Sequence, residues 1–221
     1  MSDIAYYVVW QIGVTAFWTS SSPTVLHKDR LRRKGAYILA PTHFSPYDVA
    51  CLIAISPRNL GWVSIVEVFR NPFVALFYGS MNAFPLDRSR PDSPTVRVIL
   101  DRLKRGRVVA MFPEGHIRTP ETSVLAGGPM KPGVARIAQL ADVPVIPCVI
   151  LGTGVYSQFT SWMPVRAVRY GAIFGEPLVV RKDLDKQEAT KQFMDDLRRA
   201  YLDLHVELTG AMEAREKKYE R

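Results

Sequence analysis

The stretch from Tyr37 to Asp48 reads YILAPTHFSPYD and joins a short apolar run to the first residues of an expected helix. The run from Tyr37 to Ala40 is typical of a buried strand. Ser45-Pro46 follows it, and these residues favour the cap and the first turn of a helix. A strand, a short loop and a helix in this order predict an α/β fold, in which such units repeat.

The same alternation continues along the chain. Five more short apolar runs, bounded by proline, glycine or charged residues, predict strands: Val63 to Val66, Ala83 to Leu86, Val108 to Phe112, Val145 to Leu151 and Ala167 to Phe174. Further helices are expected to begin at Asn71-Pro72 and at Ser93-Pro94, and the second of these ends at Gly106. We therefore expect a single domain over residues 1–221, with a central mixed, mostly parallel sheet flanked by helices.

Both ends of the chain carry distinctive segments. Residues 183–221 are expected to form a C-terminal helix followed by a charged tail, EAREKKYER, that frays. Residues 4–18 contain no charge and several aromatic residues, but a bilayer core needs about 20 apolar residues in a helix. We predict that residues 1–20 form a helix at the membrane interface. The alternative is a first helix packed on the protein's own core.

The composition limits the partners. The chain has 29 Lys and Arg against 21 Asp and Glu, a formal charge of +8, which favours nucleic acid, an anionic bilayer or a phosphorylated substrate. The basic residues are scattered and no nucleic-acid motif occurs, so we expect no nucleic-acid partner. Cys51 and Cys148 are the only cysteines, which indicates a reducing cytoplasmic setting rather than a disulfide framework. No metal-ligand pattern is present, so no metal is expected.

His43 and Asp48 are the first candidate for chemistry. Within a helix, positions five residues apart are separated by about 140°, so the pair requires the bend between loop and helix. With Ser45 as the cap, Asp48 lies in the first turn and its carboxylate can reach back to His43. A carboxylate bonded to one imidazole nitrogen leaves the other nitrogen as a base. Alternatively, Asp48 only caps the helix and His43 is an ordinary loop histidine.

A second candidate is the sequence FPEGHIR at 112–118, directly beyond an expected strand. Pro113 and Gly115 favour a tight turn that presents Glu114 at the edge of the sheet. There Glu114 can bind substrate hydroxyls or hold a basic neighbour. The alternative is a turn carboxylate in water.

Two further motifs complete the set. The sequence FPLDR ends at Arg88, whose forked guanidinium matches phosphate, although a pair with Asp87 or Asp92 is the alternative. The sequence VPVIPC at 143–148 is expected to be a buried structural strand that leads into the flexible Gly152-Thr153-Gly154. Cys148 is a weak candidate for an acyl-accepting nucleophile, because no histidine adjoins it in sequence.

Together these four motifs resemble the glycerophospholipid acyltransferase family, whose best-known members are lysophosphatidate and glycerol-3-phosphate acyltransferases. The blocks follow the family's order between Ala36 and Gly154. The resemblance implies that His43 and Asp48, as a His-x4-Asp motif, are catalytic. It also implies a substrate-binding set, in which Arg118 lies one residue later than the family's arginine: Arg88, Glu114, Gly115, Arg118 and Lys131.

The resemblance further implies the reaction and its setting. It implies transfer of a fatty-acyl group from an acyl thioester, acyl-CoA or acyl carrier protein, to a hydroxyl of lysophosphatidate or glycerol 3-phosphate in phospholipid biosynthesis. No cofactor is expected, and the protein is expected to be peripheral or monotopic at the cytoplasmic face of a membrane. The alternatives are another lysolipid or glycolipid acceptor, hydrolysis of the thioester by water, and a noncatalytic peripheral membrane-binding protein.

Overall fold

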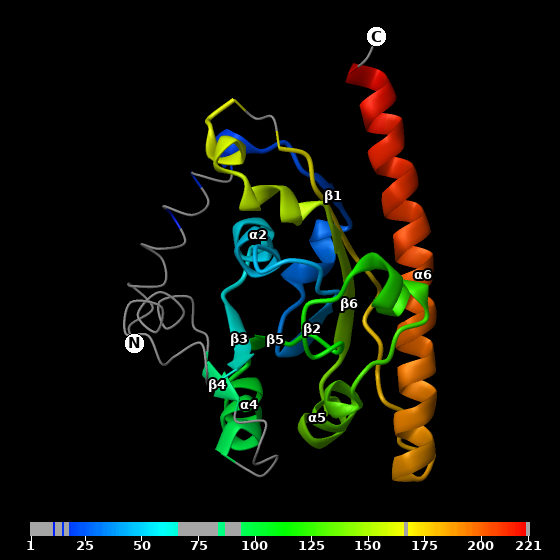
Figure 1. Ribbon diagram of the computed structural model, residues 1–221. Coiled ribbons are helices and arrows are strands. Elements are labelled where there is room, and N and C mark those ends of the chain that lie inside the picture. Colours follow the sequence, from blue (N-terminus) through cyan, green and yellow to red (C-terminus); the bar gives the residue numbers. More distant parts are fainter. Residues whose placement is uncertain are drawn as a thin grey trace.

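The computed structural model describes residues 18–65, 84–86, 94–165 and 168–219, together with Gln11 and Thr15. Seven strands of this part of the chain form one sheet (Figure 1): β1 Thr24–Leu26, β2 Tyr37–Pro41, β3 Leu60–Ile65, β4 Phe84–Leu86, β5 Val108–Ala110, β6 Val145–Leu151 and β7 Gly171–Phe174. Their order is β1-β7-β6-β2-β5-β3-β4, and all neighbours are parallel except β6 and β7.

The predicted mixed, mostly parallel sheet is therefore confirmed. Strands β6, β2 and β5 are neighbours and run in the same direction. Their carboxyl ends consequently meet at one edge of the sheet, which is where ligands bind in open α/β sheets. The chain that follows each of these strands carries one of the motifs recognised in the sequence.

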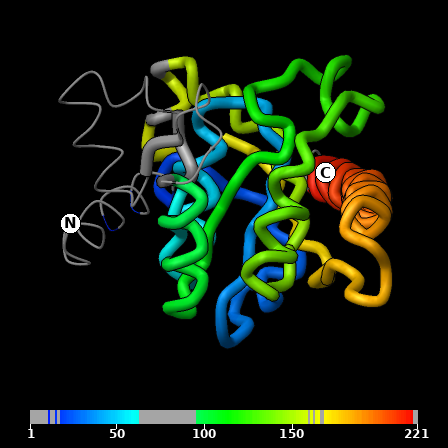
Figure 2. Tube along the Cα trace, turned by 90° about the horizontal axis from the view of Figure 1, so that it is seen from below, coloured from blue at the N-terminus to red at the C-terminus, as the bar shows by residue number. Residues whose placement is uncertain are grey.

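Helices cover both faces of the sheet. One face packs against α2 (Asp48–Ile55) and the 3-10 helices η1 (Lys28–Arg32) and η5 (Thr153–Ser157). The other face packs against the longer helices α4 (Pro94–Lys104), α5 (Gly133–Ala141) and α6 (Lys186–Tyr219). Figure 2 shows α6 nearly end-on at one side of the molecule. Three short 3-10 helices complete the described elements: η3 Pro120–Thr122, η4 Val124–Ala126 and η6 Phe159–Trp162.

The interior strand β6 shows why these apolar runs form strands. Ile146, Cys148 and Ile150 point to the α2 face, and Val145 and Val149 point to the opposite face. All five are fully buried. A strand buried on both faces reads as a continuous apolar run, and the predicted bounds Val145 to Leu151 are those observed.

Other predicted bounds shift by one to four residues. β3 begins at Leu60, whereas Val63 was expected, and β5 ends at Ala110, two residues before the expected Phe112. β5 is short because the chain leaves the sheet once it has passed Met111, whose N–H bonds Leu39 O of β2. β7 begins at Gly171, because Val168 forms only an isolated bridge to Ser21. β1 and α5 were not predicted.

The charged C-terminal tail differs from the expectation that it frays. α6 remains helical to Tyr219. The Arg215 guanidinium donates hydrogen bonds to Pro23 O (2.5 Å), Ser22 Oγ (2.6 Å) and Thr24 Oγ1 (3.2 Å). These bonds fasten the last turns of α6 to the start of β1, which explains why the helix continues.

The prediction for residues 1–20 falls mostly outside the described residues. Those described, Gln11, Thr15 and 18–20, are helical. The helix expected at Asn71-Pro72 and the side chain of Arg88 also lie outside them. No helix in the described part of the chain combines the length and apolar character needed to cross a membrane.

Candidate active site

His43 lies just beyond the carboxyl end of β2. Thr42, fully buried, keeps the chain attached to β6 at this point: its N–H donates to Cys148 O (3.0 Å), and its Oγ1 accepts from Ile150 N–H (3.2 Å). On the other face the Tyr201 hydroxyl of α6 donates to Ala40 O (2.8 Å). The backbone that presents His43 is thus held from both sides.

The predicted pair forms. Nδ1 of His43 lies 3.1 Å from Oδ2 of Asp48, the first residue of α2. The Asp48 side chain is fully buried, whereas that of His43 keeps 13% of its exposure. The carboxylate accepts a hydrogen bond from Nδ1–H and leaves Nε2 as the nitrogen that can take a proton from a substrate.

Asp48 accepts more bonds than the one to His43. Its Oδ2 also accepts from Phe44 N–H (2.8 Å) and Ser45 N–H (2.9 Å), and its Oδ1 accepts a short bond from the hydroxyl of Thr153. The start of α2 differs from the prediction, since the helix begins at Asp48 and not after Ser45. Asp48 nevertheless bonds back to Ser45 N–H as in a capping box, while it also orients the imidazole.

Phe112 holds the plane of the imidazole. Its ring stacks on that of His43 with the centroids 3.7 Å apart and the planes at 12°. Trp62 of β3, which is almost fully buried, stacks in turn on Phe112, with the ring centroids 5.3 Å apart. Phe112 was expected to end a strand and was not predicted as a site residue. It lies in the site because β5 ends two residues earlier.

Glu114 braces two loops. The side chain is buried, with 1% exposure. Its Oε2 accepts from His43 N–H (2.8 Å) and its Oε1 accepts from Val124 N–H (2.8 Å). The sequence predicted a Glu114 at a turn that binds substrate hydroxyls or holds a basic neighbour, with a carboxylate in water as the alternative. The structure instead commits both carboxylate oxygens to backbone N–H groups, one of them that of the dyad histidine.

Gly115 and Lys131 are in contact. Gly115 has a φ of +77°, which disfavours any residue with a side chain, and a Cβ built there would lie 2.8 Å from Cε of Lys131. Lys131 N–H also donates to Pro113 O (2.8 Å). The exposed ammonium group of Lys131 is therefore carried over the turn that contains Glu114.

Arg118 lies in the same site, although it comes one residue later in the sequence than the family's arginine. Its N–H donates to His43 O (2.8 Å). Its Nε is buried and has no hydrogen-bond partner among the described residues. The structure thus brings together six of the seven predicted site residues: His43, Asp48, Glu114, Gly115, Arg118 and Lys131. Arg88 lies outside the described residues.

Comparison with known proteins agrees with this geometry. A family model described as Acyltransferase matches residues 22–151, more than half of the chain. The chain belongs to the acyltransferase family. The matched region includes all four motifs, and the resemblance to the glycerophospholipid acyltransferases is confirmed by the names of its relatives.

Two such relatives are bacterial proteins named 1-acyl-sn-glycerol-3-phosphate acyltransferase. The one from Bacillus subtilis is 29% identical over 155 residues, which cover 70% of this chain and 72% of the relative. The one from Streptococcus pneumoniae is 28% identical over 118 residues, which cover 52% and 42%. This chain also superposes on a crystal structure of PlsC, the 1-acyl-sn-glycerophosphate acyltransferase from Thermotoga maritima, with a TM-score of 0.67. The superposed region covers 90% of this chain and 79% of the PlsC chain. At 19% identity this last likeness shows the shared fold.

The two cysteines of this acyltransferase are poor nucleophiles. Cys51 and Cys148 are both fully buried. Burial raises the pKa of each thiol, and the negative charge of Asp48 raises it further. Because the thiolate is the reactive form, the structure argues against Cys148 as an acyl-accepting group. Among the described residues no group of three or more His, Cys, Asp or Glu side chains could hold a metal ion.

Proposed function

We propose that this acyltransferase moves a fatty-acyl group from acyl-CoA to the free hydroxyl of lysophosphatidate. The observation that supports this most directly is the bond between His43 and Asp48, which leaves Nε2 of a partly exposed imidazole as a base. The names of the relatives from Bacillus subtilis and Streptococcus pneumoniae support lysophosphatidate as the acceptor. Glycerol 3-phosphate, which carries the same phosphate on a shorter molecule, is included as a second acceptor.

The reaction needs one base and no covalent enzyme intermediate. Nε2 of His43 takes the hydroxyl proton as the alcohol oxygen attacks the thioester carbonyl, which gives a tetrahedral oxyanion. The oxyanion collapses with cleavage of the carbon–sulfur bond, and the imidazolium returns its proton to the departing thiolate. Asp48 stabilises the imidazolium between these steps. We propose that neither a metal nor a cofactor takes part, since acyl-CoA is a co-substrate.

Arg118 and Lys131 supply the positive charge for the acceptor phosphate. Arg118 is attached by its backbone to His43, and its buried Nε is unpaired among the described residues, so a phosphate oxygen can satisfy it. Lys131 lies over the neighbouring turn at Gly115. Arg118 bonds the loop that carries the base and Lys131 lies over the adjoining turn, so a phosphate held by both would place the acceptor hydroxyl near Nε2.

The proposed setting is the cytoplasmic face of a membrane, with the protein bound peripherally. A lysophosphatidate acceptor and its diacyl product both reside in a bilayer. Residues 4–18 contain five aromatic residues that suit a headgroup boundary and no charge: Tyr6, Tyr7, Trp10, Phe17 and Trp18.

A donor and acceptor panel tests the proposal. Purified protein is incubated with radiolabelled palmitoyl-CoA or palmitoyl-acyl carrier protein, and with lysophosphatidate, glycerol 3-phosphate or other lysolipids. We expect phosphatidate from palmitoyl-CoA and lysophosphatidate, and a loss of about 10²-fold to 10⁴-fold in turnover for His43→Ala. Release of free palmitate without transfer to any acceptor would indicate a thioesterase. Wild-type turnover by a folded His43→Ala variant would exclude His43 as the base.

A further inference from the structure

Two stretches of this chain lack charged residues although the chain as a whole is 23% charged. One runs between Asp3 and Lys28, and the other between Asp142 and Arg166. The first half of the second stretch is β6, whose burial accounts for the absence of charge. The second half, residues 153–165, contains η5 and η6, and most of its described side chains other than Thr153 and Tyr156 are exposed, so burial does not explain its composition.

The described ends of the two stretches meet in the fold. The Ser20 and Tyr156 hydroxyls are hydrogen-bonded at 3.2 Å. Val168 N–H donates to Ser20 O (3.0 Å), and Ser22 N–H donates to Val168 O (2.8 Å). The segment that enters β1 and the segment η5–η6 therefore form one end of the molecule, seen beyond the carboxyl end of β6 in Figure 1.

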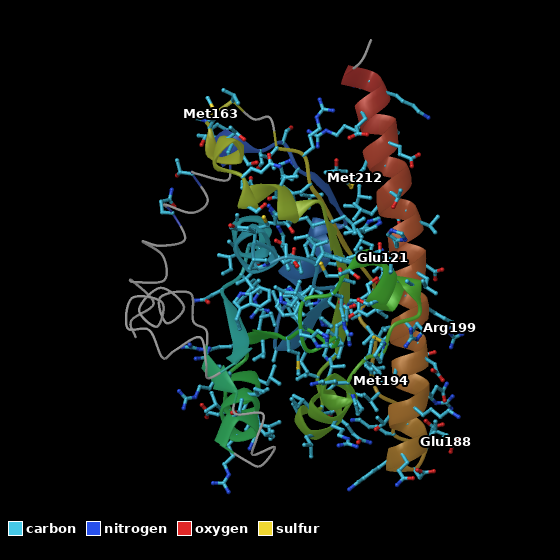
Figure 3. The ribbon with its side chains drawn as sticks, viewed as in Figure 1. Glu121, Met163, Glu188, Met194, Arg199 and Met212 are labelled. Carbon is cyan, nitrogen blue, oxygen red and sulfur yellow. The ribbon has the colours of Figure 1, made fainter. Side chains whose placement is uncertain are left out.

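Large apolar side chains are exposed at this end. Met163 is 51% exposed, Val165 is 61% exposed and Trp18 is 64% exposed. Val155 of η5 adds a smaller exposed area. In Figure 3 Met163 lies at the periphery, at the opposite end of the molecule from α4 and α5. Exposed apolar residues without charges among them are typical of a surface that contacts a membrane or another protein.

This apolar end adjoins the dyad. Thr153, the first residue of η5, donates a hydrogen bond from its hydroxyl to Asp48. A lipid acceptor has to pass from the bilayer to His43 with its phosphate in water and its acyl chain in an apolar surrounding. The site therefore has to lie beside the membrane, and among the described residues the η5–η6 segment is an exposed apolar surface that adjoins it through Thr153.

We propose that residues 153–165 form a second contact with the phospholipid bilayer, in addition to the interfacial segment at residues 1–20. Trp18 lies at the junction of the two segments and belongs to both contacts. The proposal rests on the proposed function, since the bilayer is the source of the acceptor. The contact lies beyond β6, whereas the N-terminal segment enters at β1. Because the two segments are hydrogen-bonded side by side, together they form a wider contact than either alone, which restricts the tilt of the protein and keeps the His43 side of the sheet turned toward the lipid.

Vesicle binding of matched variants tests this contact. The full chain and its Met163→Asp/Val165→Asp variant are floated with vesicles of phosphatidylethanolamine and phosphatidylglycerol. The control variant is Leu140→Asp/Val179→Asp, because these apolar residues are somewhat more exposed than Met163 and Val165, at 67% and 69%. Leu140 lies near the end of α5, and Val179 follows Leu178, which pairs with Val145 at the amino end of β6, whereas η5 follows the carboxyl end of that strand. Both variants add the same net negative charge, so a difference in vesicle binding between them depends on where on the molecule the two replaced residues lie.

We expect the Met163→Asp/Val165→Asp variant to bind vesicles about tenfold more weakly or worse, because two apolar side chains no longer enter the interface. The control should bind within about twofold of wild type. Equal binding by the first variant and wild type, or an equal loss in the control, would overturn the proposal. If the Asp variant does not fold, Met163→Ser/Val165→Ser replaces it, with Leu140→Ser/Val179→Ser as control.

A separate measurement distinguishes failure of the proposed function from failure of the proposed membrane contact. Wild-type protein is assayed with palmitoyl-CoA and a short-chain lysophosphatidate that is dissolved as monomers. This transfer does not require a bilayer, so its absence would contradict the proposed function while the vesicle comparison still decides the surface. Transfer to the monomeric acceptor together with unchanged vesicle binding in the variant would contradict the surface alone.

Discussion

The hydroxyl of Thr153 donates a hydrogen bond to the carboxylate oxygen of Asp48 that does not face His43. Both side chains are buried, with exposures of 1% and 0%. They follow different strands of the sheet, since Asp48 begins α2 after β2 and Thr153 begins η5 after β6. A buried carboxylate needs every lone pair satisfied, and this bond supplies the partner for Oδ1. Thr153 is therefore a positioning residue that acts on the base through Asp48.

Replacing Thr153 by Val should lower kcat by about 10-fold to 10²-fold, because the carboxylate loses a bond that fixes its orientation. KM for the acceptor should remain near the wild-type value. The isosteric change also leaves Oδ1 unpaired, which should cost about 1–3 kcal/mol in the free energy of unfolding. Steady-state kinetics and urea denaturation measure the two effects. Thr153→Ser keeps the hydroxyl and should retain most of the activity, and equal losses in both variants would contradict this role.

Replacing Asp48 by Asn should lower turnover by about 10²-fold to 10⁴-fold. The amide has only one acceptor oxygen, whereas Asp48 accepts from His43, two backbone N–H groups and Thr153. The amide is also neutral, so it cannot stabilise the imidazolium as the negative charge of Asp48 does. Saturating acyl transfer assays measure the loss, with circular dichroism as a check of folding. Turnover within a few-fold of wild type would show that the histidine works without its carboxylate partner.

Glu114→Gln distinguishes a brace from a substrate ligand. The amide can accept from only one of the two N–H groups that Glu114 now bonds, those of His43 and Val124. We expect kcat to fall by about 10-fold or more, because the loop carrying His43 shifts, while KM for the acceptor changes little. A raised KM at unchanged kcat would show that Glu114 binds the acceptor directly.

Arg118→Met should raise KM for a phosphate-bearing acceptor by about 10-fold to 10²-fold, since a charge-assisted hydrogen bond contributes about 1.5–3 kcal/mol. Methionine keeps the length and the apolar part of the side chain but removes the donors. Arg136→Met, at an exposed position of α5, removes the same charge away from the site and serves as the control. Equal values of KM in the two variants would mean that Arg118 does not bind the phosphate.

Stability should fall at alkaline pH. Burial raises the pKa of the Cys51 and Cys148 thiols and raises the pKa of Tyr37 to about 12. The unfolded chain therefore loses these protons at lower pH than the folded chain does. The folded state loses stability as pH rises above the pKa of the thiols in the unfolded chain, about 8.5. Each thiol contributes a slope of up to about 1.4 kcal/mol per pH unit. Urea denaturation at pH 7 to 10.5 measures it, and Cys148→Ala should reduce the slope. An identical slope in that variant would contradict the assignment.

The dyad could be predicted from sequence because its two residues are only five positions apart. The strand before His43 and the helix start at Asp48 were both local signals, and their junction determined the geometry. The roles of Thr153, Phe112 and Glu114 could not be predicted in this way. Each depends on β6, β2 and β5 being neighbours, and this order arises from packing and not from any single segment.

The elements missed in the sequence have similar causes. β1 has only three residues, too few to show an alternation of apolar and polar side chains. α5 does place Val134, Ile137 and Ala138 at helical spacing, all of them buried, but its first residue is Gly133 and no side chain caps it. The tail of α6 could not be predicted as ordered because Arg215 finds its partners near residue 23, at the other end of the chain.

The family match ends at residue 151, but the cooperative unit of this protein extends well past that boundary. Tyr201 of α6 bonds the carbonyl of Ala40, three residues before the base, and the same helix fills the core behind β2 and β6. A fragment cut at residue 151 would lose β7 and α6 and expose that apolar face to water. Expression fragments, domain fusions and chimaeras with relatives should therefore retain the chain through Arg215, where the long helix is tied back to its beginning.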